Sequence, residues 1–170
     1  MRLLVLVVLL LALDVRAQEP LALRDLEGRA VSLAPAPGGA LVAHFWATWC
    51  TSCKHELPEL DRAARACAGS SVEVVAVNVA EDADAVAGWL RERPLTLGVL
   101  RDPDGKAWRR SGGREMPANL IWTRDGVAWA LGPSSEAQWS ERLGALGCSA
   151  AAPEVRFLDA ADPPKVHPPR

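Results

Sequence analysis

Apolar and polar positions alternate along the chain in short segments, and five of these segments have the length and composition of strands or hairpins. They occupy residues 21–33, 40–46, 72–80, 95–102 and 118–131. The first and the last predict β-hairpins, because Glu27-Gly28 and Arg124-Asp125-Gly126 are typical turn sequences. The other three predict single buried strands, of which 95–102 is the weakest.

Helical spacing of apolar residues is found between these strands, in 51–68, 81–94, 134–147 and a short stretch within 103–113. Pro58 lies inside the first helix and is expected to kink it. Ser134 or Ser135 caps the last helix, which carries an apolar stripe that includes Trp139 and stops at Gly147.

The order of these segments predicts an α/β fold. Strand–helix–strand units place strands parallel to one another with right-handed crossovers, and the last hairpin adds antiparallel strands. We therefore expect a mixed central sheet with helices on both faces, preceded by an amino-terminal β-hairpin.

Both ends of the chain differ from this central part. Residues 1–17 begin with Arg2, continue with 11 apolar residues and end in small residues around Ala17, which predicts a secretory signal peptide cleaved after Ala17. The apolar run is shorter than the roughly 20 residues that span a bilayer; an uncleaved amino-terminal anchor is the alternative. Residues 18–148 form the predicted domain, and the proline-rich residues 149–170 predict a loosely structured tail.

Length, charge and cysteine content each add a constraint. With 170 residues, 49% of them hydrophobic, the chain is long enough for one domain with a core, and we expect a monomer. Its formal charge of −2 gives no indication of a nucleic-acid partner. The four cysteines allow three complete pairings, and export to an oxidising compartment would let disulfides persist.

Two of these cysteines lie in the segment HFWATWCTSCKHELPEL, residues 44–60. Cys50 falls where a predicted strand gives way to a helix, so its thiolate would face free backbone N–H groups and the positive end of the helix dipole. That position lowers a thiol pKa and makes Cys50 the nucleophile. Cys53 follows one turn later, close enough to form a disulfide with Cys50. The spacing predicts a redox pair.

The sequence supports other uses of the Cys50–Cys53 pair less well. Zinc needs four ligands, and the chain offers only His44, His55 and His167 besides its cysteines, so no dedicated metal site is expected. A structural staple would close too small a loop to stabilise much. A Cu(I)-handling module and a non-catalytic binding module remain as alternatives.

At this point the residues resemble a known family. The segment 44–60 resembles the active-site segment of TlpA/ResA-type proteins, which are thioredoxin-like, exported thiol-disulfide oxidoreductases. A second block, GGREMPANLIWTRDG, is similar to the family stretch in which a cis-proline precedes a strand, and Pro117 takes the proline position. The resemblance covers roughly residues 20–147 and implies a thioredoxin-like fold. A thiol peroxidase is disfavoured, because Ala43 and Ala47 stand where a proline and a threonine are usual upstream of a peroxidatic cysteine.

The resemblance also implies roles for individual residues. Cys50 would be the thiol that attacks a partner's disulfide, and Cys53 would be the thiol that resolves the mixed disulfide. Pro117 lies opposite the pair, and its cis bond turns the backbone of Met116 toward an extended substrate chain. Trp49 packs beside the disulfide and shapes the docking surface.

For Glu56 two interpretations stay open. It resembles an acid that tunes the cysteines in this family, and it is equally consistent with a solvated carboxylate that supports the first helical turn.

Two positions depart from the family pattern. Ser52 stands where many relatives have proline, so it keeps a backbone N–H and adds a hydroxyl near the sulfurs. We expect this to stabilise the reduced thiolate and make the pair more oxidising. His44 stands where thioredoxins carry an acid. It either passes a proton to or from Cys53 or is a neutral core residue whose ring N–H is satisfied by a carbonyl.

Cys67 and Cys148 follow the ends of two predicted helices. In a thioredoxin-like fold these helices cover the same side of the sheet in the same direction. The resemblance therefore implies a structural disulfide between the two cysteines, and two separate buried thiols are the alternative.

The function that the resemblance implies is a periplasmic or otherwise exported thiol-disulfide oxidoreductase, more a reductant than an oxidant. Its partners would be dithiols and disulfides of exported proteins, with cytochrome c or copper-site assembly factors as candidates. An upstream membrane electron donor would reduce it. The Cys50–Cys53 disulfide would be its redox group, with no separate cofactor.

Overall fold

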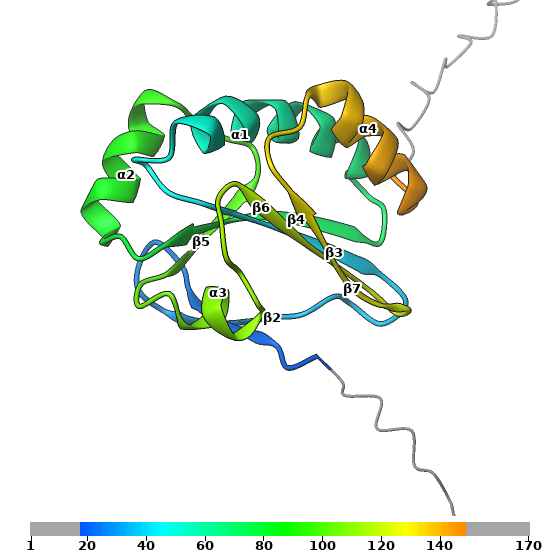
Figure 1. Ribbon diagram of the computed structural model, residues 1–170, viewed down its shortest axis with the longest axis horizontal. Coiled ribbons are helices and arrows are strands. Elements are labelled where there is room, and N and C mark those ends of the chain that lie inside the picture. Colours follow the sequence, from blue (N-terminus) through cyan, green and yellow to red (C-terminus); the bar gives the residue numbers. More distant parts are fainter. Residues whose placement is uncertain (1–17, 149–170) are drawn as a thin grey trace, which may run out of the picture.

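The computed structural model describes residues 18–148. The predicted signal peptide and the predicted proline-rich tail lie outside these described residues. Within them, the chain forms a seven-stranded sheet and four α-helices (Figure 1). Among residues 18–148, no helix is long and apolar enough to cross a membrane.

The strands are β1 Leu21–Arg24, β2 Ala30–Leu33, β3 Ala40–Trp46, β4 Val72–Val79, β5 Gly98–Asp102, β6 Ala118–Thr123 and β7 Gly126–Leu131. The helices are α1 Thr51–Ala64, α2 Ala83–Glu92, α3 Lys106–Arg110 and α4 Glu136–Ala145, and a 3-10 turn, Arg65–Cys67, continues α1.

The sheet has the order β2-β1-β5-β4-β3-β6-β7. Its centre is parallel, since β4 pairs in parallel with both β3 and β5. The two closing strands are antiparallel, with β6 on β3 and β7 on β6. The amino-terminal hairpin β1–β2 joins the sheet antiparallel to β5. The predicted mixed sheet with an amino-terminal hairpin is confirmed.

Helices cover both faces of this sheet, as predicted. Figure 1 shows α1, α2 and α4 together on one face and the short α3 on the other. Helices α1 and α2 share a face because their two successive right-handed crossovers step in the same direction along the sheet. Helix α4 lies on the same face, where it packs against α1. All seven residues of β3 are buried, which is the pattern of a strand covered on both sides.

The core has one layer on each side of the sheet. On the α3 side, Phe45 packs against Trp108, with ring centroids 4.9 Å apart. On the other side, Leu60 of α1 packs with Trp139 and Leu143 of α4. The second set of contacts holds α1 against the sheet and against α4 beside it, so the residue at its start has a fixed position.

Some boundaries differ from the sequence-based expectation, for identifiable reasons. The strand predicted from residue 95 begins only at Gly98, because the Asp61 carboxylate accepts the backbone N–H groups of Thr96 and Leu97 at 2.7 and 2.8 Å. Those N–H groups are therefore not available to a neighbouring strand. At the last helix, Ser135 is the cap and forms a reciprocal capping box with Gln138.

A disulfide ties the ends of α1 and α4 together. It joins Cys67, in the 3-10 turn after α1, to Cys148, just after α4, with their Cα atoms 4.5 Å apart. Both cysteines are buried in the same apolar cluster as Leu60 and Trp139. The start of α4 is tied to the second half of α1 as well, because Glu59 accepts the backbone N–H of Glu136 at 3.0 Å.

Candidate redox site

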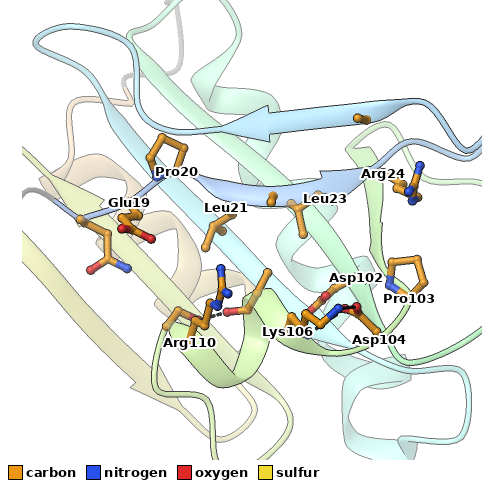
Figure 2. A pocket seen from close by; sticks show the side chains of 15 residues that line it. Glu19, Pro20, Leu21, Leu23, Arg24, Asp102, Pro103, Asp104, Lys106 and Arg110 are labelled. Atoms are coloured by element: carbon orange, nitrogen blue, oxygen red, sulfur yellow. Dashed lines mark hydrogen bonds and ion pairs between the residues drawn. The ribbon is translucent and has the colours of Figure 1, made fainter.

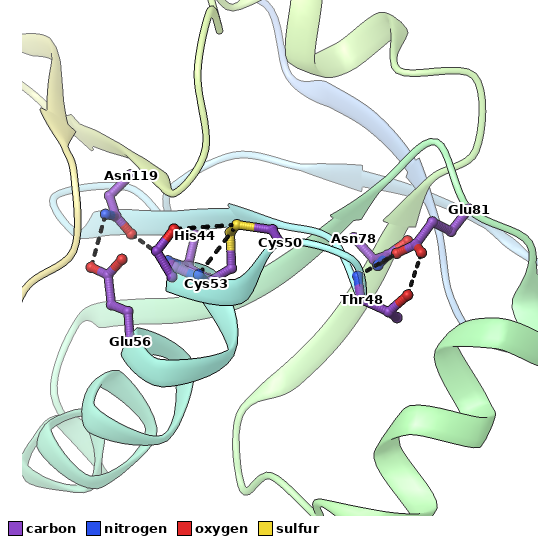
Figure 3. Close-up of a disulfide and its surroundings, with 9 residues drawn as sticks. His44, Thr48, Cys50, Cys53, Glu56, Asn78, Glu81 and Asn119 are labelled. Carbon is purple, nitrogen blue, oxygen red and sulfur yellow. Dashed lines mark hydrogen bonds between the residues drawn. A yellow bond between two sulfur atoms is a disulfide. The ribbon is translucent and has the colours of Figure 1, made fainter.

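The redox pair lies where β3 gives way to α1. Cys50 is the N-cap residue of α1, and its Sγ accepts the backbone N–H of Cys53 at 3.2 Å (Figure 3). The two cysteines form a disulfide, with Cα atoms 5.3 Å apart. In the reduced protein the same N–H and the helix dipole would stabilise negative charge on Cys50. The change from strand to helix that the sequence predicts at Cys50 is therefore found there.

The two cysteines differ in their exposure to solvent. Cys50 keeps 5% of its surface exposed, whereas Cys53 is fully buried. Trp49, directly before Cys50, is 68% exposed and is the most exposed large apolar residue of the described chain. An incoming disulfide would thus reach Cys50 beside an exposed aromatic ring.

The segment that contains Pro117 comes to the same place. The Met116–Pro117 peptide bond is cis, and Pro117 is buried. Met116 is half-buried and packs against the apolar cluster that contains both Cys50 and Cys53. The structure therefore brings the two sequence blocks together, although they lie more than 60 positions apart.

Glu56 is buried, with only 1% of its surface exposed, which rules out the solvated carboxylate that the sequence left open. Its Oε1 accepts the indole N–H of Trp139 at 3.0 Å and the side-chain amide of Asn119 at 3.4 Å. Burial raises its pKa to about 7, and the two hydrogen bonds only partly offset this. The carboxyl is therefore close to half protonated near neutral pH.

His44 is fully buried in β3, directly opposite Asn119 of β6. Its Nδ1 lies 2.7 Å from Asn119 Oδ1. Burial lowers the pKa of His44 to about 4, and the bond to Asn119 opposes that effect only in part. The ring is neutral at pH 7. The carbonyl group that satisfies it belongs to an asparagine side chain rather than to the backbone.

Ser52 lies near the sulfur of Cys50, as the sequence predicts. The Ser52 hydroxyl is 3.7 Å from Cys50 Sγ, within the range of a weak hydrogen bond to sulfur. His55 is exposed. Among residues 18–148, no group of three or more histidine, cysteine or acidic side chains is arranged to hold a metal ion.

Sequence reasoning missed a second set of polar residues beside Cys50. The Glu81 carboxylate accepts the backbone N–H of Thr48 at 2.7 Å, the Thr48 hydroxyl, and the side-chain amide of Asn78 at 2.6 Å (Figure 3). The residue before it, Ala80, has a φ of 60°, which is unusual for a residue other than glycine. This clamp holds the loop that carries Trp49 and Cys50.

It also missed Asn119, and it treated Trp139 only as part of an apolar stripe. A usable signal was present: a buried histidine or glutamate needs a polar partner, so His44 calls for an amide or hydroxyl on the neighbouring strand. What the sequence did not give was the strand register that makes Asn119 that partner.

A hollow of about 710 Å³ lies elsewhere, between β1 and α3 (Figure 2). Its lining includes Leu21, Arg24, Asp104 and Arg110, and none of the redox-site residues. Its charged side chains are of both signs, and Lys106 and Asp104 pair with each other. The redox pair itself lies at a surface rather than in this hollow.

Comparison with known proteins agrees with this description. The model of the AhpC/TSA family matches residues 14–128. ResA, a thiol-disulfide oxidoreductase of Bacillus thuringiensis, is 28% identical over 102 residues, which are 60% of this chain and 59% of the relative. The sporulation thiol-disulfide oxidoreductase A of Bacillus subtilis is 26% identical over 124 residues, covering 70% of this chain and 74% of the relative. The chain thus spans less than two thirds of ResA.

Solved structures show the same fold. A secreted disulfide oxidoreductase of Mycobacterium tuberculosis, described as homologous to Escherichia coli DsbE, has a TM-score of 0.65 and 27% identity, and the match covers 74% of this chain and 95% of that one. StoA of Bacillus subtilis has a TM-score of 0.61 and 26% identity, with 71% and 92% covered. The thioredoxin-like fold and the ResA-type resemblance inferred from the sequence are both confirmed. Since the family model spans more than half of the chain, the chain belongs to the AhpC/TSA family.

Proposed function

We propose that this chain is an exported thiol-disulfide oxidoreductase that reduces disulfides of other exported proteins. The observation that carries the proposal is the hydrogen bond from the Cys53 backbone N–H to Cys50 Sγ at the start of α1. It favours the thiolate form of one cysteine, the one with some exposed surface, while its partner stays buried. The names of the relatives support the same chemistry.

The reaction follows from this asymmetry. The Cys50 thiolate attacks one sulfur of a client disulfide, a new S–S bond forms to Cys50, and the other client sulfur leaves and takes up a proton. The Cys53 thiol then loses its proton and attacks Cys50 Sγ. The bond between Cys50 and the client breaks, and the second client sulfur leaves as a thiol. The client gains two electrons and two protons, and the chain ends as the Cys50–Cys53 disulfide. The pair is itself the redox group, so no separate cofactor takes part.

The surface around the pair suits a polypeptide client. Trp49 offers an exposed ring beside Cys50, and Met116, whose side chain packs against the cluster that holds the cysteines, supplies backbone just before the cis bond to Pro117. An extended client segment would pair with this backbone while its disulfide faces Cys50. The hollow between β1 and α3 has no part in this reaction.

The place and direction of the reaction rest on the signal-like residues 1–17 and on the family resemblance. A periplasmic or otherwise exported reductant needs an upstream electron donor in the membrane. Its clients would be the haem-binding cysteines of apocytochrome c or the cysteines of copper-site assembly factors. Peroxidase chemistry is not proposed, because Ala43 and Ala47 stand where a proline and a threonine are usual upstream of a peroxidatic cysteine.

The first test is the reduction potential of the Cys50–Cys53 couple, measured in dithiothreitol or glutathione buffers through Trp49 fluorescence. A value near that of thioredoxin, about −270 mV, supports a reductant. A value near about −120 mV would make the chain an oxidant or isomerase. A couple with no reversible two-electron step would contradict the proposal and favour Cu(I) handling or a binding module.

The second test is capture of a client. Reduced Cys53→Ala protein should form a stable mixed disulfide with an oxidised peptide that contains a Cys-x-x-Cys-His sequence, because the resolving thiol is missing. Cys50→Ala is the matched control and should form none. Equal trapping by both variants would show that Cys50 is not the attacking thiol.

A further inference from the structure

Four buried side chains from four different elements form one hydrogen-bonded row under the redox pair. Trp139 of α4 and Asn119 of β6 both donate hydrogen bonds to the same oxygen of Glu56 on α1. The Asn119 side chain also forms a hydrogen bond with His44 of β3. All four are at most 1% exposed. Asn119 is the member that connects the two titratable groups.

The bonds of Asn119 fix the orientation of its amide. Its Nδ2 faces Glu56 Oε1 and the backbone carbonyl of Ala130, at 3.4 and 3.3 Å. The Ala130 carbonyl can only accept, so the NH₂ group must point that way. The Asn119 Oδ1 then faces His44 at 2.7 Å and can only accept a hydrogen bond from it.

This orientation fixes the state of the histidine ring. His44 Nδ1 must carry the proton that Asn119 Oδ1 accepts. Because a neutral imidazole carries only one N–H, Nε2 is left with a lone pair. Within residues 18–148, this Nε2 is buried and has no hydrogen-bond partner. An unmatched buried acceptor destabilises the oxidised state in which it occurs.

Reduction supplies a donor on the helix above it. Cys53 and Glu56 are three residues apart on α1 and therefore share a helix face. Glu56 reaches Asn119, which is the cross-strand partner of His44. The face that carries Cys53 therefore lies over this pair, and in Figure 3 the His44 ring lies between Asn119 and the disulfide. A disulfide sulfur has no proton to donate, whereas the thiol of reduced Cys53 has one.

We propose that Asn119 is a positioning residue that holds His44 Nε2 as the acceptor for the thiol proton of reduced Cys53. A hydrogen bond to the neutral thiol keeps the proton on Cys53 and leaves the thiolate to Cys50. It also stabilises the reduced state, because it satisfies an acceptor that the oxidised state leaves unmatched. This inference deepens the proposed function and rests on it for its biological meaning.

The change is balanced with dithiothreitol as the reductant. Its two thiols donate two electrons and two protons and become a cyclic disulfide, and the Cys50–Cys53 bond breaks. One proton stays on Cys53 Sγ and points to His44 Nε2. The other goes to solvent when Cys50 is a thiolate. No client protein is needed, so the inference can be tested even if the chain reduces no client.

The test is ¹⁵N NMR of the histidine rings in the oxidised and the dithiothreitol-reduced protein. The signals of His44 are those that disappear in His44→Phe. We expect the neutral Nδ1–H tautomer in both states, and a shift of the Nε2 resonance on reduction in the direction of an accepted hydrogen bond. A neutral Nε2–H tautomer, or an Nε2 resonance that does not move on reduction, would overturn the proposal.

Two variants separate positioning from general packing. Asn119→Leu should give a mixture of His44 tautomers and a roughly tenfold change in the equilibrium with dithiothreitol toward the disulfide, which corresponds to a potential about 30 mV more negative. Trp139→Phe is the control: it removes a hydrogen bond to Glu56 but none to His44, so the tautomer should stay fixed. If Asn119→Leu keeps a single Nδ1–H tautomer and an unchanged equilibrium, Asn119 does not position the ring. If it does not fold, the measurement on the unaltered chain still decides.

Discussion

The indole N–H of Trp139 on α4 lies 3.0 Å from Glu56 Oε1 on α1, and this bond joins two helices inside the core. It leaves the second oxygen of Glu56 without a partner among residues 18–148. The environment is therefore better suited to a neutral carboxyl than to a carboxylate, which is why burial raises the Glu56 pKa to about 7. On the other side of Asn119, burial lowers the pKa of His44 to about 4.

These opposite shifts predict how stability depends on pH. Between about pH 4.5 and 7, folded Glu56 keeps a proton that the unfolded chain has lost, so stability falls as the pH rises. Between about pH 4 and 6.5, folded His44 lacks a proton that the unfolded chain has gained, so stability rises with pH. Each slope is at most about 1.4 kcal/mol per pH unit. Their contributions should nearly cancel between about pH 4.5 and 6.5.

Single variants should reveal each slope. Urea unfolding of Glu56→Gln should show stability that falls as the pH drops below about 6.5, the effect of His44 alone. His44→Phe should show stability that falls as the pH rises toward about 7, the effect of Glu56 alone. Glu141→Gln, at an exposed position on α4, is the control and should follow the unaltered chain. Parallel pH profiles for all four proteins would contradict the shifts.

Ser52 sets a second prediction. Its hydroxyl lies 3.7 Å from Cys50 Sγ, where it can donate to the thiolate of the reduced protein. Ser52→Pro removes this hydroxyl and the Ser52 backbone N–H, so the reduction potential should become more negative, by about 30 mV for a tenfold effect. Thr51→Pro is the matched control, because it adds a proline at the first helical position but keeps the Ser52 hydroxyl and the Ser52 backbone N–H. An unchanged or higher potential in Ser52→Pro would contradict the role of Ser52.

The disulfide between Cys67 and Cys148 should act on stability rather than on chemistry. It closes a loop between residues 81 positions apart, which predicts a stabilisation of about 4 kcal/mol by the loop-entropy model. The double variant Cys67→Ser, Cys148→Ser should unfold at a correspondingly lower urea concentration. Its Cys50–Cys53 potential should stay the same, since the second disulfide lies at the far end of α1. A potential that shifts in the double variant would mean that the two disulfides are coupled.

The sequence predicted the parts of the fold that local chemistry decides. The run 40–46 is apolar throughout because β3 is covered on both faces, and the strand-to-helix change at Cys50 follows from the apolar run and the helical pattern around it. The mixed sheet follows from the order of the elements. The family resemblance, rather than spacing, supplied Pro117 as a site residue and the pairing of Cys67 with Cys148.

The sequence did not predict which residues pair with the buried polar groups, because these pairings depend on strand register and on how the helices pack. Whether Glu56 is solvated or buried is decided by α4, which covers it from a distance of 83 positions. Whether His44 has an amide partner is decided by a register of β3 and β6 that places Asn119 opposite it. A single sequence shows that such groups need partners, but it does not show which residues they are.

The clamp at Glu81 is of this kind, and it yields the last prediction. Three donors, two from Thr48 and one from Asn78, meet one carboxylate, and the left-handed Ala80 before it costs roughly 1–2 kcal/mol. Glu81→Gln keeps one oxygen for the Thr48 N–H and the Asn78 amide and turns its NH₂ group toward the Thr48 hydroxyl, which must then accept. The bonds to a charged carboxylate become weaker bonds to a neutral amide. Stability should therefore fall by about 1–3 kcal/mol.

The same change should loosen the loop that presents Trp49 and Cys50, and mixed-disulfide formation with the client peptide should slow by about tenfold, since small misplacements of a reacting group are costly. The reduction potential should change little, because the Cys53 N–H and the Ser52 hydroxyl still face Cys50. Glu73→Gln, on the exposed side of β4, is the control and should leave both stability and rate unchanged. A loss of stability without slower exchange would make Glu81 a purely structural residue. Slower exchange with an unchanged potential would show that the clamp positions the nucleophile.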